Sequence, residues 1–452
     1  MNQVISSKKR LLTISILFIS TFISLANQTM MITAIHYIAQ EMQISLNTAQ
    51  WLTTGYVMMV GIITPLSATL YNKITNRHYY LTTIAIFITG TLIGCLATNF
   101  PLLLMARFIQ AMASGLLMSF QITTIISLYP KEKRGTMMGI SSLIISFGPA
   151  IGPSLGGLIL KQLNWHYFFI LFLPIMILMW LIGFFIFPNF SQPKPVTIEF
   201  YSLILSLLGV GLVMFGISII STQRVIGLIS LVIGIGLTAI FVSHQLKMKH
   251  PFLQIQLFRF RSFRILTMVS ILTFMILIGT EQMIALFAEQ VIHVSSMQSG
   301  LILLPGAVSN AIFASIAGKI YDHYGPKYIV CTGFIIMILS ALPFTMLTAK
   351  TSLWWIAVCY ALRMIGNALV FSATMSESFL KVPQQDASHA TAINNSMRQI
   401  GAATITTTLI VISNCPRSFT LGMHLAMWIT VGIAILGLIL FILYLHQQEA
   451  AD

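Results

Sequence analysis

The chain has 452 residues, of which 57% are hydrophobic and only 8% are charged, and its mean hydropathy is +0.91. Soluble proteins carry about 25% charged residues, so this chain cannot cover a water-facing surface. The composition excludes a soluble enzyme, a soluble nucleic-acid-binding domain and a fibre, and it predicts a polytopic membrane protein. Its apolar runs, such as Val196–Ile220 and Val225–Val242, are continuous rather than alternating, which predicts spanning helices rather than barrel strands.

Fourteen stretches are long and apolar enough to cross the hydrocarbon, which takes about 20 residues. In chain order the first six are 11–38, 48–71, 79–98, 101–127, 135–161 and 166–188. The next eight are 198–220, 224–246, 263–290, 296–320, 327–348, 352–380, 387–413 and 419–445. The sequence therefore predicts an all-α membrane protein with fourteen transmembrane helices and short connections.

Lys and Arg residues of the loops are distributed unevenly between the two predicted membrane faces. Seventeen lie on the face that carries both termini, and four, Lys161, Arg224, Lys350 and Arg417, lie on the other. Because cytoplasmic loops are enriched in Lys and Arg, both termini are predicted to be cytoplasmic. This topology accounts for most of the net charge of +14, so the charge implies no nucleic-acid partner.

Two parts of the sequence resemble each other weakly. The stretch 68–73 after the second span, which contains Asn72, recurs after the tenth span as 318–322, which contains Asp322. Spans 1–6 thus match spans 9–14, and spans 7 and 8 are an inserted pair. Two six-helix halves of this kind are typical of the major facilitator transporters. We expect a first half at 1–190, the inserted helices with their linkers at 191–250, and a second half at 251–452.

Two glycine-rich motifs stand out. The fifth span contains GPAIGPSLGG, with Gly148, Pro149, Gly152, Pro153, Gly156 and Gly157. Glycines at every fourth position form a smooth face for close helix approach, and each proline removes a backbone hydrogen bond. The loop after the tenth span contains Gly318, Asp322 and Gly325, where glycine permits a tight turn and the carboxylate can contact a helix N-terminus. The alternative for the first motif is helix packing without a further role, and the alternative for the second motif is an ordinary loop.

These motifs resemble the drug:proton antiporter branch of the major facilitator family, whose signature is GPxxGPxxGG. Further stretches that look like this branch are Trp51–Tyr56, Arg107–Gln110, Trp165–Pro174, Leu257–Phe263, Gly300–Pro305 and Asn394–Gly401. With fourteen spans, the chain is similar to exporters of quaternary ammonium compounds, dyes and quinolones from Gram-positive bacteria. The resemblance implies a monomeric exporter of hydrophobic, often cationic, drugs in the plasma membrane, driven by the proton gradient without a cofactor or metal.

The sequence departs from this family's pattern in two motifs. Members usually carry Asp in an L-D-x-T sequence of span 1, whereas this chain has Asn27, which cannot take up a proton. The first-half counterpart of the loop motif has Asn72 and Thr75 in place of Asp and Gly, which leaves open whether the first half forms a latch. Arg107 resembles the arginine of the family that is thought to sense the proton site.

The proton-binding residue can be sought by elimination, because the chain has only ten acidic residues. Most of them are predicted at the cytoplasmic face, including Glu377, which lies one turn from Lys381 and is expected to reach water. Glu41 and Glu289 end their spans at the outer rim and are the reserve candidates.

Only Glu281 is predicted to lie inside a span. It is 17 residues, or ~26 Å of helix, beyond Arg264, just as Asn27 is 17 residues beyond Arg10. An intramembrane carboxylate is a functional candidate, and Glu281 is therefore the predicted proton-coupling residue. The alternative is a carboxylate paired permanently with a buried Arg.

Uncharged polar side chains within the spans are candidates for binding varied ligands. They are Asn27, Gln28, Tyr56, Gln110, Gln282 and Asn394. Two other functions remain as alternatives. A proton-coupled metabolite symporter or facilitator would share the fold, but the glycine–proline run argues against it. A membrane enzyme or sensor would need His or acidic residues clustered at one membrane face, so we predict a transporter rather than an enzyme.

Overall fold

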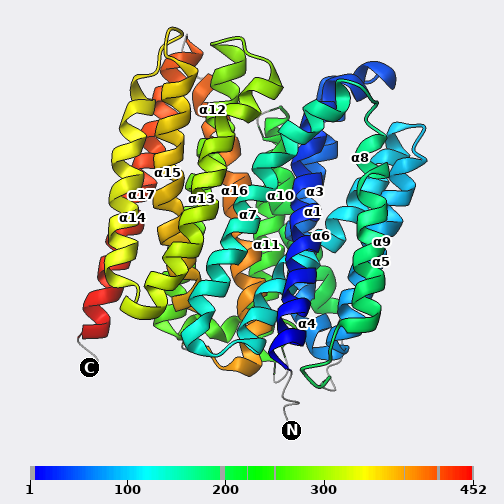
Figure 1. Ribbon diagram of the computed structural model, residues 1–452, viewed down its shortest axis with the longest axis vertical. Helices are drawn as coiled ribbons and strands as arrows, with labels where there is room; N and C mark the ends of the chain where they lie inside the picture. The colour runs from blue at the N-terminus through cyan, green and yellow to red at the C-terminus, as the bar shows by residue number, and fades with distance from the viewer. Residues whose placement is uncertain are drawn as a thin grey trace. The chain divides into compact units, whose positions relative to one another are not determined.

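The computed structural model describes residues 6–193, 199–220, 222–248, 251–380, 382–414 and 418–449, which are mostly helical (Figure 1). The first helices are α1 (Ser7–Glu41), α2 (Leu46–Ala49), α3 (Trp51–Ile63), α4 (Leu66–Lys73), α5 (Asn76–Cys95), α6 (Phe100–Leu128), α7 (Lys131–Leu160), α8 (Tyr167–Ile170), α9 (Phe172–Ile186), α10 (Phe200–Ile219) and α11 (Arg224–Lys247). After these come η1 (Ile255–Arg259), α12 (Arg261–Gln290), α13 (Ser296–Tyr324), α14 (Lys327–Ala341), η2 (Leu342–Met346), α15 (Leu353–Ser378), η3 (Gln384–Asp386), α16 (Ala387–Asn414) and α17 (Phe419–Glu449). The all-helical prediction is confirmed for these residues.

Twelve helices of the described residues are long and apolar enough to cross a membrane, or thirteen if α3 and α4 form one span. The protein is therefore a multi-pass membrane protein. Helix α16, the predicted thirteenth span, is not among the twelve because it carries buried polar side chains: Asn394, Asn395, Arg398 and Gln399. The count of fourteen spans is thus not confirmed. The predicted start of the seventh span at residue 198, and Arg417 of the charge count, lie outside the described residues.

The second predicted span is bent rather than straight. Helices α3 and α4 meet at an angle of 50° around Thr64 and Pro65. Proline has no backbone N–H to donate, and its ring clashes with the preceding turn, so Pro65 is the physical cause of the bend.

Contacts between residues divide the chain into two compact units, which are described separately. Unit 1 comprises Met1–Leu128, Ile151–Ile255 and Gln384–Gln399, and unit 2 comprises Tyr129–Ala150, Gln256–Pro383 and Ile400–Asp452. Two helices change unit along their length: α7 begins in unit 2 and ends in unit 1, whereas α16 begins in unit 1 and ends in unit 2. The halves predicted from the sequence remain a prediction.

Each unit has its own packed interior. In unit 1, residues of α1, α3, α6 and α8 gather around Trp165 and Phe169, and α10 packs on both α3 and α11. In unit 2, α13, α14, α15 and α17 pack around Phe334 and Phe441, and they stand side by side in Figure 1. Because lipid is as apolar as these side chains, close packing rather than water exclusion holds such helices together. These interiors fix the positions of the polar side chains described next.

Candidate functional site

The polar centre of unit 1 is built around Arg107 on α6, whose side chain is fully buried. Its Nη1 donates to the side-chain oxygen of Asn27 and, at 2.9 Å, to Oε1 of Gln110. Its Nη2 donates to the carbonyl oxygen of Gln28 at 3.2 Å, and Nε to that of Leu52 at 3.3 Å. All of these acceptors are neutral, so the contacts engage Nε, Nη1 and Nη2 of the guanidinium without balancing its charge.

Tyr56 on α3 completes this centre. The Arg107 guanidinium carbon lies 4.2 Å from the centroid of the Tyr56 ring, which is a cation–π contact. The Tyr56 hydroxyl shares a hydrogen bond with Ser114, and Gln110 donates through Nε2 to Thr91 at 2.9 Å. The structure therefore brings together four of the six predicted ligand-binding residues, Asn27, Gln28, Tyr56 and Gln110, with the predicted Arg107. The fifth, Asn394, is buried in the unit 1 part of α16, and the sixth, Gln282, is half-buried on α12 of unit 2.

Two polar atoms of this centre have no hydrogen-bond partner among the described residues: Nδ2 of Asn27 and Oε1 of Gln28. The orientation of the Asn27 amide is fixed, because only its oxygen can accept from Arg107. Its NH₂ group therefore points away from the guanidinium and is left without an acceptor. A buried donor of this kind is a place where a ligand or water can bind.

In unit 2, Glu281 lies on α12 inside the predicted span and is half-buried. Among the described residues, no side chain or backbone group forms a hydrogen bond or an ion pair with it. Its charge acts on the buried Tyr360 of α15, which also interacts with Arg363. Arg363 itself donates to the carbonyl oxygen of Met337 at 3.1 Å and to Thr430 at 2.8 Å. A permanent ion pair between Glu281 and a buried Arg is thus not found in the described part of unit 2.

The two reserve acids lie at the ends of their helices. Glu41 is the last residue of α1, is exposed, and accepts a hydrogen bond from the indole of Trp165 at 2.8 Å. Glu289 is the last but one residue of α12 and is half-buried. Glu281 and Arg107 belong to different units, and each is placed within its own.

The predicted exposure of Glu377 at the inner rim is wrong. This residue lies at the end of α15 and is only 5% exposed. Its carboxylate accepts hydrogen bonds from the hydroxyls of Tyr321 on α13, at 2.7 Å, and Tyr444 on α17, at 2.5 Å. The two tyrosines cover the carboxylate. The spacing between Glu377 and Lys381, which lies outside the described residues, indicates neither these contacts nor the burial of Glu377.

The loop motif of unit 2 forms a charged contact between α13 and α7. Asp322 accepts hydrogen bonds from the backbone N–H groups of Gly135 and Thr136, both at 2.9 Å, and from the Thr136 hydroxyl at 2.7 Å. Gly325 ends α13 with φ = 72°, a conformation that favours glycine. A Cβ atom on Gly318 would lie 2.8 Å from the Thr136 Cα, so the two helices touch backbone to backbone.

The corresponding contact in unit 1 exists but is neutral. Asn72, at the end of α4, donates through Nδ2 to the Ser388 hydroxyl at 3.2 Å and lies 3.1 Å from Nε2 of His389. Both partners belong to the first turn of α16. Asn72 thus contacts the start of α16 as Asp322 contacts the start of α7, but without a carboxylate.

The glycine–proline run lies in α7, where the unit boundary divides it. Gly148 and Pro149 belong to the unit 2 part of the helix, and the later members belong to the unit 1 part. A Cβ atom on Gly152 would lie 2.7 Å from the carbonyl oxygen of Ala26, and one on Gly156 would lie 2.9 Å from that of Met30. The second part of α7 therefore packs against the backbone of α1 next to Asn27.

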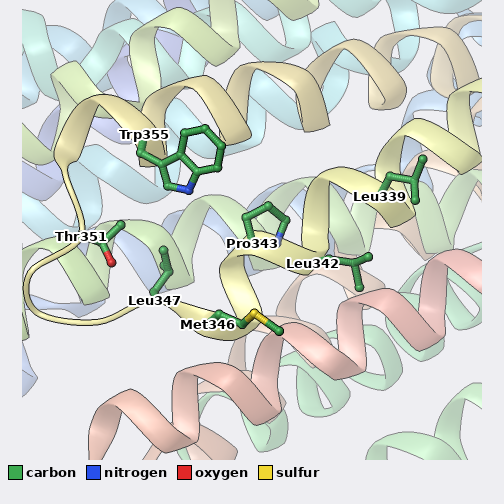
Figure 2. Close-up of a pocket in the computed structure, with 7 residues that line it drawn as sticks. All are labelled: Leu339, Leu342, Pro343, Met346, Leu347, Thr351 and Trp355. Carbon is green, nitrogen blue, oxygen red and sulfur yellow. The ribbon is translucent and has the colours of Figure 1, made fainter.

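A groove of about 470 Å³ lies away from these residues, on α14, η2 and the start of α15 (Figure 2). Figure 2 shows Pro343, Met346, Leu347 and Trp355 around it, with Thr351 as its polar residue. None of the predicted site residues lines it. In the part of the chain that the structure describes, no three His, Cys, Asp or Glu side chains gather to hold a metal ion.

The family of the chain follows from comparison with known proteins. The model of the Major Facilitator Superfamily matches residues 17–406. The uncharacterized MFS-type transporter YcnB of Bacillus subtilis (strain 168) is 34% identical, and the match covers 100% of this chain and 99% of that protein. The lincomycin resistance protein LmrB of Listeria innocua is 32% identical over 86% of this chain and 84% of its own length.

A solved structure shows the same fold. The crystal structure of the human organic anion transporter MFSD10 (TETRAN) matches with a TM-score of 0.70, covering 95% of this chain and 99% of that chain at 14% sequence identity. The fold, the family match and the transporter-named relatives agree with one another. The chain therefore belongs to the Major Facilitator Superfamily, and it is a multi-pass membrane transporter rather than an enzyme.

Proposed function

We propose that the protein is a proton-coupled multidrug efflux antiporter that exports hydrophobic, often cationic, compounds by alternating access. It works as a monomer in the plasma membrane with both termini cytoplasmic, and the proton gradient drives it without a cofactor. The similarity to LmrB, which is named a lincomycin resistance protein, supports drugs as the substrate class.

The observation that carries this proposal is the contact between α7 and α1. The glycine–proline run resembles the antiporter signature, and Gly152 and Gly156 lie directly on the α1 backbone. Contacts this close need helices without intervening side chains. The same run argues against the alternative, a symporter or facilitator of this fold.

Proton coupling in this proposal belongs to Glu281. It is the acid that lies within a span without a hydrogen-bond partner among the described residues, whereas the carboxylate of Glu377 is held by two tyrosines. A carboxylate in that setting can exchange a proton as its surroundings change. Glu281 also offers the negative charge that cationic substrates need.

The proposal is tested in inverted membrane vesicles loaded with a proton gradient, with ethidium as the cationic probe. We expect uptake that a protonophore abolishes, and we expect Gly152→Leu to abolish it while the protein remains in the membrane. Gly236→Leu is the matched control, because a Cβ atom there meets nothing within 4 Å. Uptake that ignores the protonophore, or normal transport by Gly152→Leu, would contradict the proposal.

The orientation is tested separately by labelling single cysteines in a chain without its native cysteines. A cysteine at Ser191 should react only with a reagent that reaches the cytoplasm, and one at Thr222 only with an external reagent. The reverse pattern would overturn the charge argument for the topology.

A further inference from the structure

We propose that the Arg107–Asn27 centre of unit 1 binds a carboxylate group of the substrate, so that amphiphilic compounds with a free carboxylate, zwitterions included, are preferred substrates. This inference rests on the proposed function as an exporter and adds the chemical class that one part of the binding site selects. The sequence resemblance pointed instead to cationic compounds in general.

The first step is the charge of the centre. Arg107 is fully buried, and every hydrogen-bond acceptor around it is neutral. The acidic residues described in unit 1 lie elsewhere. Glu41 contacts Trp165, Glu199 contacts His244, and Asp386 lies in η3 beside the start of α16. A buried cation is favoured by a counter-charge, and within this unit the protein does not supply one.

The second step is the direction of the free donor. Nδ2 of Asn27 is buried and has no acceptor among the described residues, while its amide oxygen is held by Arg107. A carboxylate beside the guanidinium would accept from this NH₂ group and share the charge of Arg107. The side-chain oxygen of the neighbouring Gln28 is also buried without a hydrogen-bond partner among the described residues.

The third step compares Asn27 with the aspartate that the family usually carries there. An aspartate would place its own carboxylate beside Arg107 and would neutralise it. Asn27 has the same shape without the charge, so the counter-charge for Arg107 is left to the ligand. An ammonium group in the same place would meet an unbalanced positive charge and would be repelled.

Gln28 and Thr29 follow Asn27 on α1. Both are half-buried, whereas Asn27 and Arg107 are not exposed. The aromatic ring of Tyr56 stacks against the guanidinium, and such a ring suits the apolar body of an amphiphile. Binding at this point therefore combines one charged contact with an apolar wall.

The test uses two dyes that differ in one group: rhodamine B, which has a free carboxylate, and its ethyl ester, which does not. We expect wild-type protein in nanodiscs to bind rhodamine B about ten-fold more tightly than the ester, by fluorescence anisotropy. Vesicles should show the same preference in the concentration that gives half-maximal uptake. The ester serves as an internal control for each variant.

Two variants neutralise Arg107 independently. Asn27→Asp and Gln110→Glu each place a carboxylate against the guanidinium, and each should remove the preference for rhodamine B over the ester. Asn99→Asp is the matched control, because it adds the same charge at the exposed residue before α6 and should keep the preference.

The outcomes separate this inference from the proposed function. Equal binding of both dyes by the wild type, or an unchanged preference in both neutralised variants, would overturn the inference even if both dyes are exported. A preference in nanodiscs that the two variants remove would support it even if vesicles show no proton-driven uptake, in which case the antiporter proposal alone fails.

Discussion

Units 1 and 2 carry different chemical groups at corresponding positions. The first helix of unit 1 has Asn27 where the matching helix of unit 2 has Glu281, and both residues lie 17 positions beyond an arginine near the start of their helix. The loop contact to α16 uses Asn72, whereas the contact to α7 uses Asp322. At both positions unit 1 has an amide and unit 2 has an acid.

This difference divides the work between the units. A carboxylate is costly to keep in a membrane, so acids that persist there are usually functional. Unit 2 keeps Glu281 and the buried Glu377 in its helices, and we assign the proton chemistry to this unit. Unit 1 keeps a buried arginine with neutral partners, and its amides provide hydrogen bonds that do not change with protonation.

The largest effect is expected from removing the acid of α12. Glu281→Gln keeps the shape of the side chain but cannot bind and release a proton, so proton-driven efflux in vesicles should fall to background. Glu41→Gln should only slow efflux, because Glu41 is exposed at the end of α1. Glu289→Gln is the control for loss of one acid from the same helix.

The opposite result would place proton coupling elsewhere. If Glu281→Gln transports normally while Glu41→Gln or Glu289→Gln does not, the coupling site lies at the outer rim. A loss in Glu41→Gln would make the division of work between the units wrong, because Glu41 belongs to unit 1, whereas a loss in Glu289→Gln would keep proton coupling in unit 2.

The second effect concerns the charged loop contact. Asp322→Asn can accept through only one oxygen, so it loses charge-assisted hydrogen bonds from Gly135 and Thr136. We expect the transport rate to fall about ten-fold. Thr136→Val removes only the hydroxyl contact and should lower the rate about two-fold. The rates are measured in vesicles at equal protein content.

Asn72→Asp is the reciprocal variant, because it gives unit 1 the acid that it lacks. We expect a change in rate of less than about three-fold, since the Ser388 hydroxyl can donate to a carboxylate in its present position. A loss as large as that of Asp322→Asn would show that the neutrality of the unit 1 contact is itself required.

The sequence predicted the helices better than it predicted their contacts, and the reason is physical. The length of an apolar run is a local property, so each predicted span falls on one helix or on consecutive helices, although the polar α16 is not apolar enough to count as a membrane span. The bend between α3 and α4 could have been predicted from Pro65. The glycines of the fifth span also indicated close packing, because their spacing defines one helix face.

Contacts between residues that are far apart in the sequence were harder to predict. Glu377 was predicted at the rim from its spacing to Lys381, but Tyr321 and Tyr444, 56 and 67 positions away, cover it. The hydrogen bond that Asn72 donates to Ser388 joins residues that are 316 positions apart, and no local sequence pattern indicates it. Arg107 and Asn27 were each named from the sequence, whereas the unpartnered Asn27 NH₂ group required the structure.

The third effect is on stability rather than on transport chemistry. Glu377→Gln replaces one acceptor oxygen by an NH₂ group, so one of the two tyrosine hydroxyls loses its carboxylate acceptor. We expect destabilisation of about 1–3 kcal/mol, measured as a lower melting temperature in detergent. Tyr444→Phe removes one donor and should destabilise less. A stable variant that loses proton-driven transport would instead make Glu377 a second coupling acid.

The smallest effect is expected from the one ion pair found among the described residues. Glu199, just before α10, accepts from the Ser202 hydroxyl and lies 2.9 Å from Nε2 of His244 on α11, and both side chains of the pair are one-third exposed. The Ser202 hydrogen bond, and then that of His244, lower the pKa of Glu199 below its usual value. A lowered pKa means that the folded protein favours the ionised form.

The sign of the pH dependence follows from that direction. The contact stabilises the protein above the usual pKa of a glutamate, and the stabilisation is lost as the pH falls through the lowered value. Because the pair is partly exposed, its contribution is below about 1 kcal/mol. Glu199→Gln should therefore lower the melting temperature at pH 7 by no more than about 2 °C, and the difference from the wild type should shrink as the pH falls below the usual pKa of a glutamate. Transport should be unchanged, because this acid of unit 1 lies outside the spans. Loss of proton-driven transport in Glu199→Gln would break the comparison, since proton chemistry would then belong to unit 1 as well.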